Sequence, residues 1–390
     1  MKKDRIYLDY CATTPVDPVV LDAMIPYFSG KFGNASSIHS YGRETKIPLE
    51  ESRETVATLL GAKPGEVFFT SGGTEADNYA VIGAAFAARR SAGKNHIIVS
   101  AVEHHAVLRS AEYLGANGFD ITILPVDGKG RVDPGTLDKA MTARTALVSI
   151  IHANNEIGTL QPIRELAGVA HARGVPFHSD TVQSVGKIPV NVDDLGVDIL
   201  SLSAHKFYGP KGVGAVYLRK GVDIDSVVHG GAQERNRRAG TESLPLVVGL
   251  AKALELSSGG IAEETARLSA LRAHLRALLE AGFEGVLFNG DESNRIPHLL
   301  SVSFDSKWFD LDGEALLLNM DLAGVAVTSG SACSSGSMEP SHVLQAIGRD
   351  VRTARASIRF SFGKTTTEEE LDRVVEILRE VLPKCAAVVH

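Results

Sequence analysis

The segment Ile199-Leu200-Ser201-Leu202-Ser203-Ala204-His205-Lys206 ends an apolar strand with a lysine in a polar turn. The apolar run predicts a buried strand. A lysine at such a strand end can lose its hydration and become a nucleophilic amine. Most lysines are solvated surface charges, so Lys206 alone is weak evidence and the neighbouring segments decide its role. Lys211, between Pro210 and Gly212 in a turn, is the weaker candidate.

Short apolar runs on both sides of this segment alternate with helical patterns. The predicted strands are Val67–Thr70, His96–Ser100, Ile121–Leu124, Ala146–Ile151, Pro176–His178, Ile199–Leu202 and Ala215–Leu218. The predicted helices between them are Glu75–Arg90, Ala106–Asn117, Pro134–Met141 and Ile163–Arg173. This alternation predicts an α/β fold, with a mostly parallel sheet covered by helices on both faces. Ligands of such sheets bind at the carboxyl ends of the strands.

The pattern changes after Thr241, where longer helices precede a second group of strands. The elements predicted there are helices at Ser243–Leu256, Ala262–Ala281, Leu311–Met320 and Thr367–Val381, and strands at Leu299–Phe304 and Ser357–Ser361. We expect them to form a smaller α+β domain that the N-terminal segment joins. The predicted large domain is residues 15–256, and the predicted small domain is residues 1–14 together with 257–390.

The composition is that of an ordinary globular protein, with 44% hydrophobic and 22% charged residues in a chain of 390. A formal net charge of −7 argues against nucleic acid or an anionic membrane as the main partner. The start fits no signal peptide and no stretch fits a transmembrane helix, so we expect a cytoplasmic protein. The three cysteines lie far apart and predict neither a disulfide framework nor a metal site.

Two strand ends near the Lys206 segment carry groups that suit a phosphorylated ring cofactor. Asp180 follows the apolar run Val175–Phe177, and an acid there can hold a pyridine nitrogen protonated. A helix N-cap is the alternative role for Asp180. The turn Ser71–Thr74 joins a strand to a helix start, where backbone N–H groups and the helix dipole suit a phosphate.

Histidine and amide side chains follow two further strands. His104 comes after the strand His96–Ser100, where an imidazole can stack on a cofactor ring and move protons. The adjacent His105 points in another direction, which argues against a two-histidine metal site. Asn155 lies in a polar cluster after the strand Ala146–Ile151, where its amide can bond an oxygen of the cofactor.

Small and polar residues surround Cys333 in the segment Thr328–Ser337. A core cysteine usually lies among large apolar neighbours, so this pattern predicts an exposed loop. An exposed thiol of this kind is typical of a nucleophile or a sulfur carrier. Cys11 is predicted to be a small residue packed in a turn, and Cys385 is predicted to have no chemical role.

Taken together, these segments resemble the NifS/IscS-type cysteine desulfurases, which are fold type I pyridoxal-phosphate (PLP) enzymes. The resemblance extends from Leu8-Asp9-Tyr10 to Ile358-Arg359-Phe360-Ser361. It implies PLP as the cofactor, L-cysteine as the substrate, and alanine plus a persulfide on Cys333 as the products. The loop and the following Met338–His342 are similar to the long-loop group that serves iron–sulfur cluster assembly. The resemblance therefore also implies a homodimer that passes sulfur to an iron–sulfur scaffold or another acceptor protein.

The same resemblance implies a role for each site residue. Lys206 would hold the cofactor covalently, His104 would stack on its ring and move protons, and Asp180 would pair with the ring nitrogen. Asn155 and Gln183 would contact the phenolate side. The residues implied to hold the phosphate are Gly73, Thr74, Ser203 and His205, with Thr241 supplied by the neighbouring subunit. The residues implied to bind the substrate are Arg359, whose planar guanidinium suits a carboxylate, with Asn34 near it, and Asn155.

Two other functions stay open at this point. An aminotransferase or a lyase of the same fold, such as a selenocysteine lyase, would share Lys206 and Asp180 but give Cys333 no role. A non-catalytic scaffold would keep the fold only to bind partners. That second alternative does not explain why lysine, acid, imidazole and phosphate turn occur together.

Overall fold

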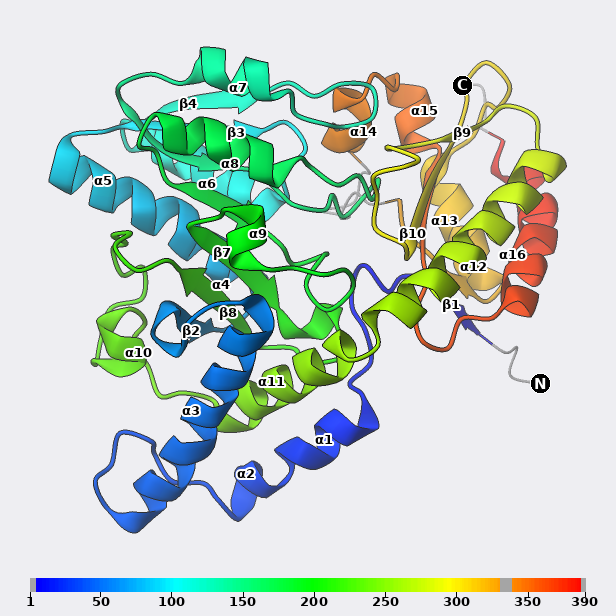
Figure 1. Cartoon of the computed structure of the whole chain (residues 1–390). Helices are drawn as coiled ribbons and strands as arrows, with labels where there is room; N and C mark the ends of the chain where they lie inside the picture. The colour runs from blue at the N-terminus through cyan, green and yellow to red at the C-terminus, as the bar shows by residue number, and fades with distance from the viewer. Residues whose placement is uncertain (1–4, 330–338, 387–390) are drawn as a thin grey trace.

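A seven-stranded sheet forms the centre of the larger part of the molecule in the computed structural model, which describes residues 5–329 and 339–386 (Figure 1). Its strand order is β2-β8-β7-β6-β5-β3-β4. The strands are β2 (Val67–Thr70), β3 (His96–Ser100), β4 (Asp120–Leu124), β5 (Thr145–Ser149), β6 (Phe177–Asp180), β7 (Ile199–Ser203) and β8 (Gly214–Leu218). Within this sheet β8 runs antiparallel to both neighbours, and the other pairs are parallel. The predicted α/β fold is confirmed.

Helices cover both faces of this sheet, as the apolar strands require. Every residue of β3, β5, β6 and β7 is buried, which is typical of parallel strands packed on both sides. One face packs against α1 (Pro18–Met24), α3 (Ser40–Leu60), α7 (Pro134–Ala140), α8 (Ile163–Ala172) and α11 (Leu244–Ser258). The other face packs against α4 (Gly73–Asn78), α5 (Ala84–Ala92) and α6 (His105–Ala116).

Two helical regions differ from the prediction. The predicted helix Glu75–Arg90 is α4 and α5, joined by a π turn at Tyr79–Gly83. The helix α3, whose 21 residues include Pro48 in the interior, is absent from the elements predicted from the sequence. Proline normally interrupts a helix, because it lacks an N–H and its ring clashes with the preceding turn. Burial of the apolar side of α3 against α11 and the sheet stabilises the helix despite this proline.

A second sheet lies in the C-terminal part, with the antiparallel order β12-β10-β9. The elements there are α12 (Ile261–Gly282), β9 (Val286–Phe288), β10 (Leu299–Phe304), α13 (Gly313–Leu322), β11 (Val325–Ala326), α14 (His342–Ala346), α15 (Val351–Arg355), β12 (Ser357–Ser361) and α16 (Glu368–Val381). The N-terminal strand β1 (Ile6–Tyr7) pairs with β11, and Ile6 and Leu8 share the core of this part. The predicted domain boundaries stay a prediction.

The chain passes from the large sheet to the C-terminal part at the junction of α11 and α12 (Figure 1). The two helices are bent by 73° at this junction. Among the described helices none is long and apolar enough by itself to cross a membrane, and α11 with α12 meets that test only as a bent pair. At the carboxyl ends of β6 and β7, Asp180 and Ser203 line the same cavity as Arg359 of the C-terminal part.

Candidate active site

A cavity of about 390 Å³ lies at the carboxyl ends of the parallel strands. It collects side chains that follow β2, β3, β5, β6 and β7, together with residues from the N-terminal segment and β12. The predicted site residues that line it are Gly73, Thr74, His104, Asn155, Asp180, Gln183, Ser203, His205, Lys206 and Arg359. The structure therefore brings together in one cavity most of the residues to which the sequence assigned a role.

Lys206 ends the short 3-10 turn Ala204–Lys206 that follows β7. Its Nζ donates hydrogen bonds to the backbone oxygens of Cys11, at 2.6 Å, and Ala12, at 2.7 Å. Burial lowers the pKa of Lys206 from 10.5 to about 8, so a neutral and nucleophilic amine is accessible near physiological pH. Lys211 is exposed and is not among the described residues that line this cavity.

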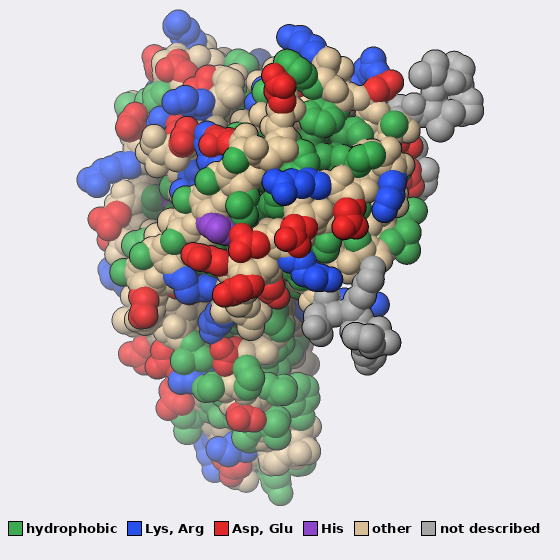
Figure 2. Space-filling model, turned by 90° about the vertical axis from the view of Figure 1, so that its right-hand side faces the viewer, with side chains coloured by type: hydrophobic (Ala, Val, Ile, Leu, Met, Phe, Trp, Pro, Cys, Tyr) green, Lys and Arg blue, Asp and Glu red, His purple; other side chains and the backbone are tan. Residues whose placement is uncertain are grey.

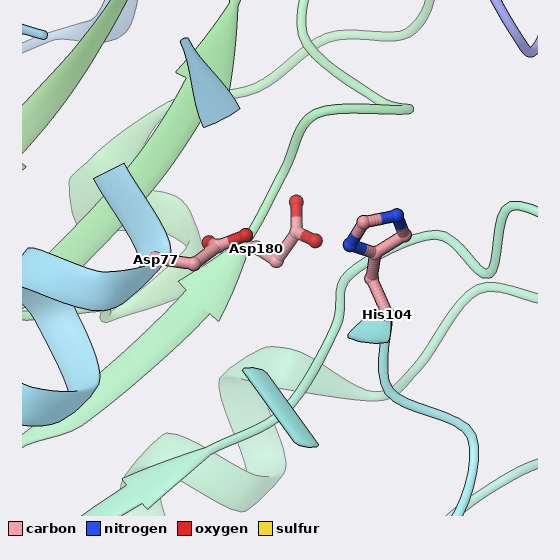
Figure 3. A group of neighbouring side chains, drawn as sticks. All are labelled: Asp77, His104 and Asp180. Carbon is pink, nitrogen blue, oxygen red and sulfur yellow. The ribbon is translucent and has the colours of Figure 1, made fainter. Parts of the chain in front are cut away.

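Figure 3 shows Asp180 between Asp77 and His104, and all three residues line the cavity. One carboxylate oxygen of Asp77, one of Asp180 and one ring nitrogen of His104 all lie within 4.8 Å of one another. Asp180 is the last residue of β6, and its Oδ1 accepts a hydrogen bond from the Val182 N–H at 2.9 Å. The Nδ1 of His104 accepts the Ala106 N–H at the start of α6, so the other ring nitrogen is left to face a ligand.

Burial controls the protonation of this group. It raises the pKa of Asp180 to about 6, and it also raises the pKa of Asp77 well above its ordinary value, with Asp180 as the second cause. Burial lowers the pKa of His104 to about 4, and the positive charge of Lys206 contributes to this shift. Behind the site, burial raises the pKa of Glu103 to about 8. A site with several buried acids and a neutral imidazole favours a cationic partner, such as a protonated ring nitrogen or a divalent metal ion.

Ser203 and the turn before α4 form the opposite end of the cavity. The Ser203 Oγ is buried and has no hydrogen-bond partner among the described residues. A Cβ on Gly73 would lie 2.9 Å from the Val182 Cγ2, so a larger residue would crowd this turn. The His205 Nδ1 lies 3.1 Å from the Thr13 Oγ1, and burial lowers the pKa of His205 to about 4. These hydroxyl and N–H donors fit a phosphate, and the unpartnered Ser203 hydroxyl is the feature that a bound phosphate would satisfy.

Arg359 enters the cavity from β12 on the C-terminal side. Its Nη2 donates to the Asp9 Oδ1 at 2.9 Å, and its Nη1 donates to the Asn155 backbone oxygen at 2.8 Å. Its Nε is buried and has no partner among the described residues. The guanidinium is thus fixed at two points and still offers an N–H, which suits recognition of a substrate carboxylate. Burial raises the pKa of Asp9, although Arg359 opposes this shift.

Two hydrogen bonds fix the side chain of Gln183, which is predicted to contact the phenolate side of the cofactor. Its Nε2 donates to the Cys11 backbone oxygen at 2.9 Å, and its Oε1 accepts from the Lys187 Nζ at 3.4 Å. Cys11 is 1% exposed, as predicted for a packed turn. Its carbonyl accepts hydrogen bonds from both Lys206 and Gln183, and no sequence pattern predicts this contact.

Two predicted site residues, Asn34 and Thr241, are not among the described residues that line this cavity, and a third, Cys333, cannot be placed relative to it. Asn34 is not among the described residues that line it, and its Oδ1 accepts the Ser36 N–H in the turn before α3. The prediction that Asn34 lies near Arg359 gains no support within one chain. Thr241 is exposed ahead of α11, also outside the described lining, and its role stays a prediction. Cys333 lies outside the described residues, whereas Thr328, which lines the cavity, comes five residues before it in the sequence.

Comparison with known proteins identifies the family. Residues 6–374 match the aminotransferase class-V family. A cysteine desulfurase IscS of Dictyoglomus turgidum is 51% identical over 382 residues, which cover 98% of this chain and 95% of the relative. The chain belongs to the cysteine desulfurases of the class-V aminotransferase family. The family predicted from the sequence is confirmed.

Solved structures of similar proteins share the fold. A NifS-like protein with 38% identity superposes with a TM-score of 0.90 and covers 97% of this chain and 100% of its own. A structure of SspA in complex with cysteine has 34% identity and a TM-score of 0.80, over 92% of this chain and 98% of its own. The chain thus has the fold of the type I PLP enzymes, and its family depends on PLP. The acid, amine and hydroxyl donors of the cavity fit that cofactor, which is the better explanation of the Asp77–His104–Asp180 group than a metal ion.

Proposed function

We propose that this chain takes sulfur from L-cysteine, holds it as a persulfide on Cys333 and releases alanine. The observation that carries the proposal is the meeting of Lys206, Asp180 and Arg359 in one cavity. These residues supply an amine, a buried acid and a carboxylate receptor, which are the groups that amino-acid chemistry on PLP needs. The family's desulfurase activity and the relative solved in complex with cysteine support cysteine as the amino acid.

PLP, when bound, accepts the electron pair left on the substrate's α-carbon after that carbon loses its proton. Asp180 keeps the ring nitrogen protonated, and its burial strengthens this pairing because little water competes for the charge. Lys206 would hold the cofactor and, with its amine free, would take the α-proton on its Nζ. With a pKa of about 8, its amine is matched to removing and returning a proton near neutral pH.

Arg359 and Asn155 orient the substrate by its carboxylate, and His104 covers the ring and moves protons. The Cys333 thiolate then attacks the substrate sulfur. A sulfur–sulfur bond forms, the carbon–sulfur bond breaks, and its electron pair stays with the carbon skeleton, which takes up a proton and leaves as alanine. Thr74, Gly73, Ser203 and His205 would hold the phosphate during these steps.

An exposed apolar surface supports a homodimer. Between residues 19 and 47, eight large hydrophobic side chains are each at least 48% exposed: Val19, Leu21, Ile25, Phe28, Phe32, Ile38, Tyr41 and Ile47. Figure 2 shows hydrophobic side chains gathered on the lower part of the molecule, where Figure 1 places α1, α2 (Pro26–Ser29) and the start of α3. Apolar patches of this kind mark protein interaction surfaces. A second copy docked here is the proposed partner, with Thr241 completing the neighbouring phosphate site.

The sulfur acceptor that we propose is an iron–sulfur scaffold or another carrier protein in the cytoplasm. The similarity of the sequence around Cys333 to the long-loop group that serves iron–sulfur cluster assembly supports transfer to a protein acceptor. The net charge of −7 gives no support to a nucleic-acid partner.

The variant Cys333→Ser separates this function from a lyase of the same fold. We expect cysteine still to change the absorbance of the bound cofactor, because Cys333 acts only after the α-proton has moved. We also expect alanine production largely to stop. A Cys333→Ser protein that makes alanine and sulfide at the parent rate would instead show a lyase in which this thiol has no part.

A further inference from the structure

Three consecutive residues before Thr241 adopt a strained backbone. Glu234, Arg235 and Asn236, in the short helix α10 (Gln233–Asn236), have φ values of 44°, 60° and 64°. Residues other than glycine seldom occupy this left-handed region, because the side chain crowds the backbone. Such strain persists only where the surroundings hold it in place, and it is common at functional sites.

Glu234 is held by a buried ion pair. Arg53 of α3 donates from Nη1 to Oε2 at 2.6 Å and from Nη2 to Oε1 at 3.0 Å, and both side chains are almost completely buried. The same Oε2 accepts the Phe69 N–H at 2.9 Å. Phe69 lies in β2, an edge strand of the large sheet, so Glu234 satisfies an N–H that would otherwise lack a partner strand.

Arg238 holds the other side of the turn that follows β2. Its Nε and Nη2 donate to the two carboxylate oxygens of Glu75 at 2.8 and 3.2 Å. Glu75 in turn accepts the Ser71 N–H at 3.0 Å. Glu234 therefore binds β2, which precedes the turn Ser71–Thr74, and Arg238 binds the first turn of α4, which follows it.

We propose that Glu234 and Arg238 are positioning residues that hold the turn Ser71–Thr74 in the shape that binds the cofactor phosphate. We call the contacts of Glu234 with Arg53 and Phe69 and of Arg238 with Glu75 the clip. This inference rests on the proposed function, because it takes that turn as the phosphate site. Arg53 pairs with both Glu234 and Glu50, Glu50 also pairs with Arg235, and Arg238 pairs with Glu75, so the positive and negative charges of these contacts are equal in number and add no net formal charge to the phosphate. The contribution of the clip is geometric. Thr241 follows Arg238 by three residues, so the same contacts restrain the segment that leads to Thr241.

The charge balance makes the direction of a mutational effect informative. Glu234→Gln removes a negative charge near the site and keeps the shape of the side chain. An effect through charge alone would strengthen binding of the phosphate dianion. Loss of the clip would weaken that binding, because the turn would have to be ordered by the ligand itself.

The test compares PLP with pyridoxal, which has no phosphate, in binding to the full-length apoprotein prepared from the holoenzyme. For Glu234→Gln and for Arg238→Met we expect about tenfold weaker PLP binding, roughly the loss of one charge-assisted hydrogen bond, and unchanged pyridoxal binding. Arg173→Met is the matched control, since it removes an ion pair with Asp138 between α7 and α8. The control should leave both affinities unchanged.

Two results would overturn the clip: PLP binding that is unchanged or tighter in both variants, or a loss that is equal for PLP and pyridoxal, which indicates general damage. Arg238→Met decides the question if Glu234→Gln does not fold, because the Arg238–Glu75 pair is partly exposed and not part of the deep core. A parent protein that binds PLP no better than pyridoxal would refute the phosphate site itself. That outcome is distinct from a failure of the clip, in which the parent prefers PLP and the variants keep the preference.

Discussion

The buried amine of Lys206 should make the stability of the apoprotein depend on pH in a predictable way. Its pKa falls from 10.5 in an ordinary lysine to about 8 in the folded chain, chiefly because of burial. Below pH 8 the folded and unfolded states both carry the proton. Between pH 8 and 10.5 only the unfolded state binds it, so the free energy of unfolding rises with pH over this window.

The size of this effect follows from the same two values. Each pH unit of separation corresponds to about 1.4 kcal/mol, so the full difference is about 3 kcal/mol. Lys206→Met keeps the length of the side chain and removes the titrating group. Relative to this variant, the parent should gain roughly 2–3 kcal/mol in unfolding free energy between pH 8 and 10.

Urea unfolding of both apoproteins at several pH values measures this gain. The difference between the two curves cancels the titrating groups that do not interact with Lys206. Lys211→Met, which removes an exposed lysine from the next turn, should give a curve parallel to the parent. Parallel curves for the parent and Lys206→Met would refute the view that Lys206 is a desolvated amine in the folded protein.

Three further predictions concern the loaded enzyme. Borohydride reduction of the holoenzyme followed by peptide mapping should place the cofactor on Lys206, and a modification on Lys211 would overturn that assignment. Arg359→Lys should lower kcat/KM for cysteine about tenfold or more, because lysine loses the bidentate contact with the substrate carboxylate, while the cofactor absorbance stays unchanged. If Arg359→Ala keeps kcat/KM intact, another residue binds the substrate carboxylate. Mixing Lys206→Ala chains with Thr241→Ala chains should restore activity, because both defects fall in one site of the heterodimer, whereas sedimentation of an active monomer would contradict a shared site.

The large sheet and the ends of its strands could be predicted, since their information is local. Apolar runs and polar turns alternate, and parallel strands present their carboxyl ends at one edge. The predicted strand Pro176–His178 nevertheless ends too early, because β6 continues through Ser179 to Asp180. Ser179 and Asp180 are polar, and polar residues after an apolar run predict a turn, although here they are buried at the end of the strand.

The contacts that complete the site were not predictable in the same way. The carbonyls of Cys11 and Ala12, which hold Lys206, are nearly 200 residues away in the sequence. Backbone oxygens carry no sequence signal, so only the folded chain shows them. Asp9 and Asp77 likewise gain their meaning from tertiary contacts, with Arg359 and with Asp180 respectively. The Glu234 contact combines a strained backbone with Arg53 of α3. That helix is hard to predict from the sequence because Pro48 lies in its interior.

The central claim is that Cys333 receives the sulfur of cysteine. The most direct test incubates the holoenzyme with ³⁵S- and ¹³C-labelled L-cysteine, measures labelled alanine, and maps labelled sulfur by mass spectrometry of peptides alkylated without reductant. We predict one added sulfur on the peptide that contains Cys333, formed in step with the first equivalent of alanine and absent from the peptides of Cys11 and Cys385. Alanine formed at full rate with no sulfur on Cys333, or with sulfur on another residue, would contradict the account.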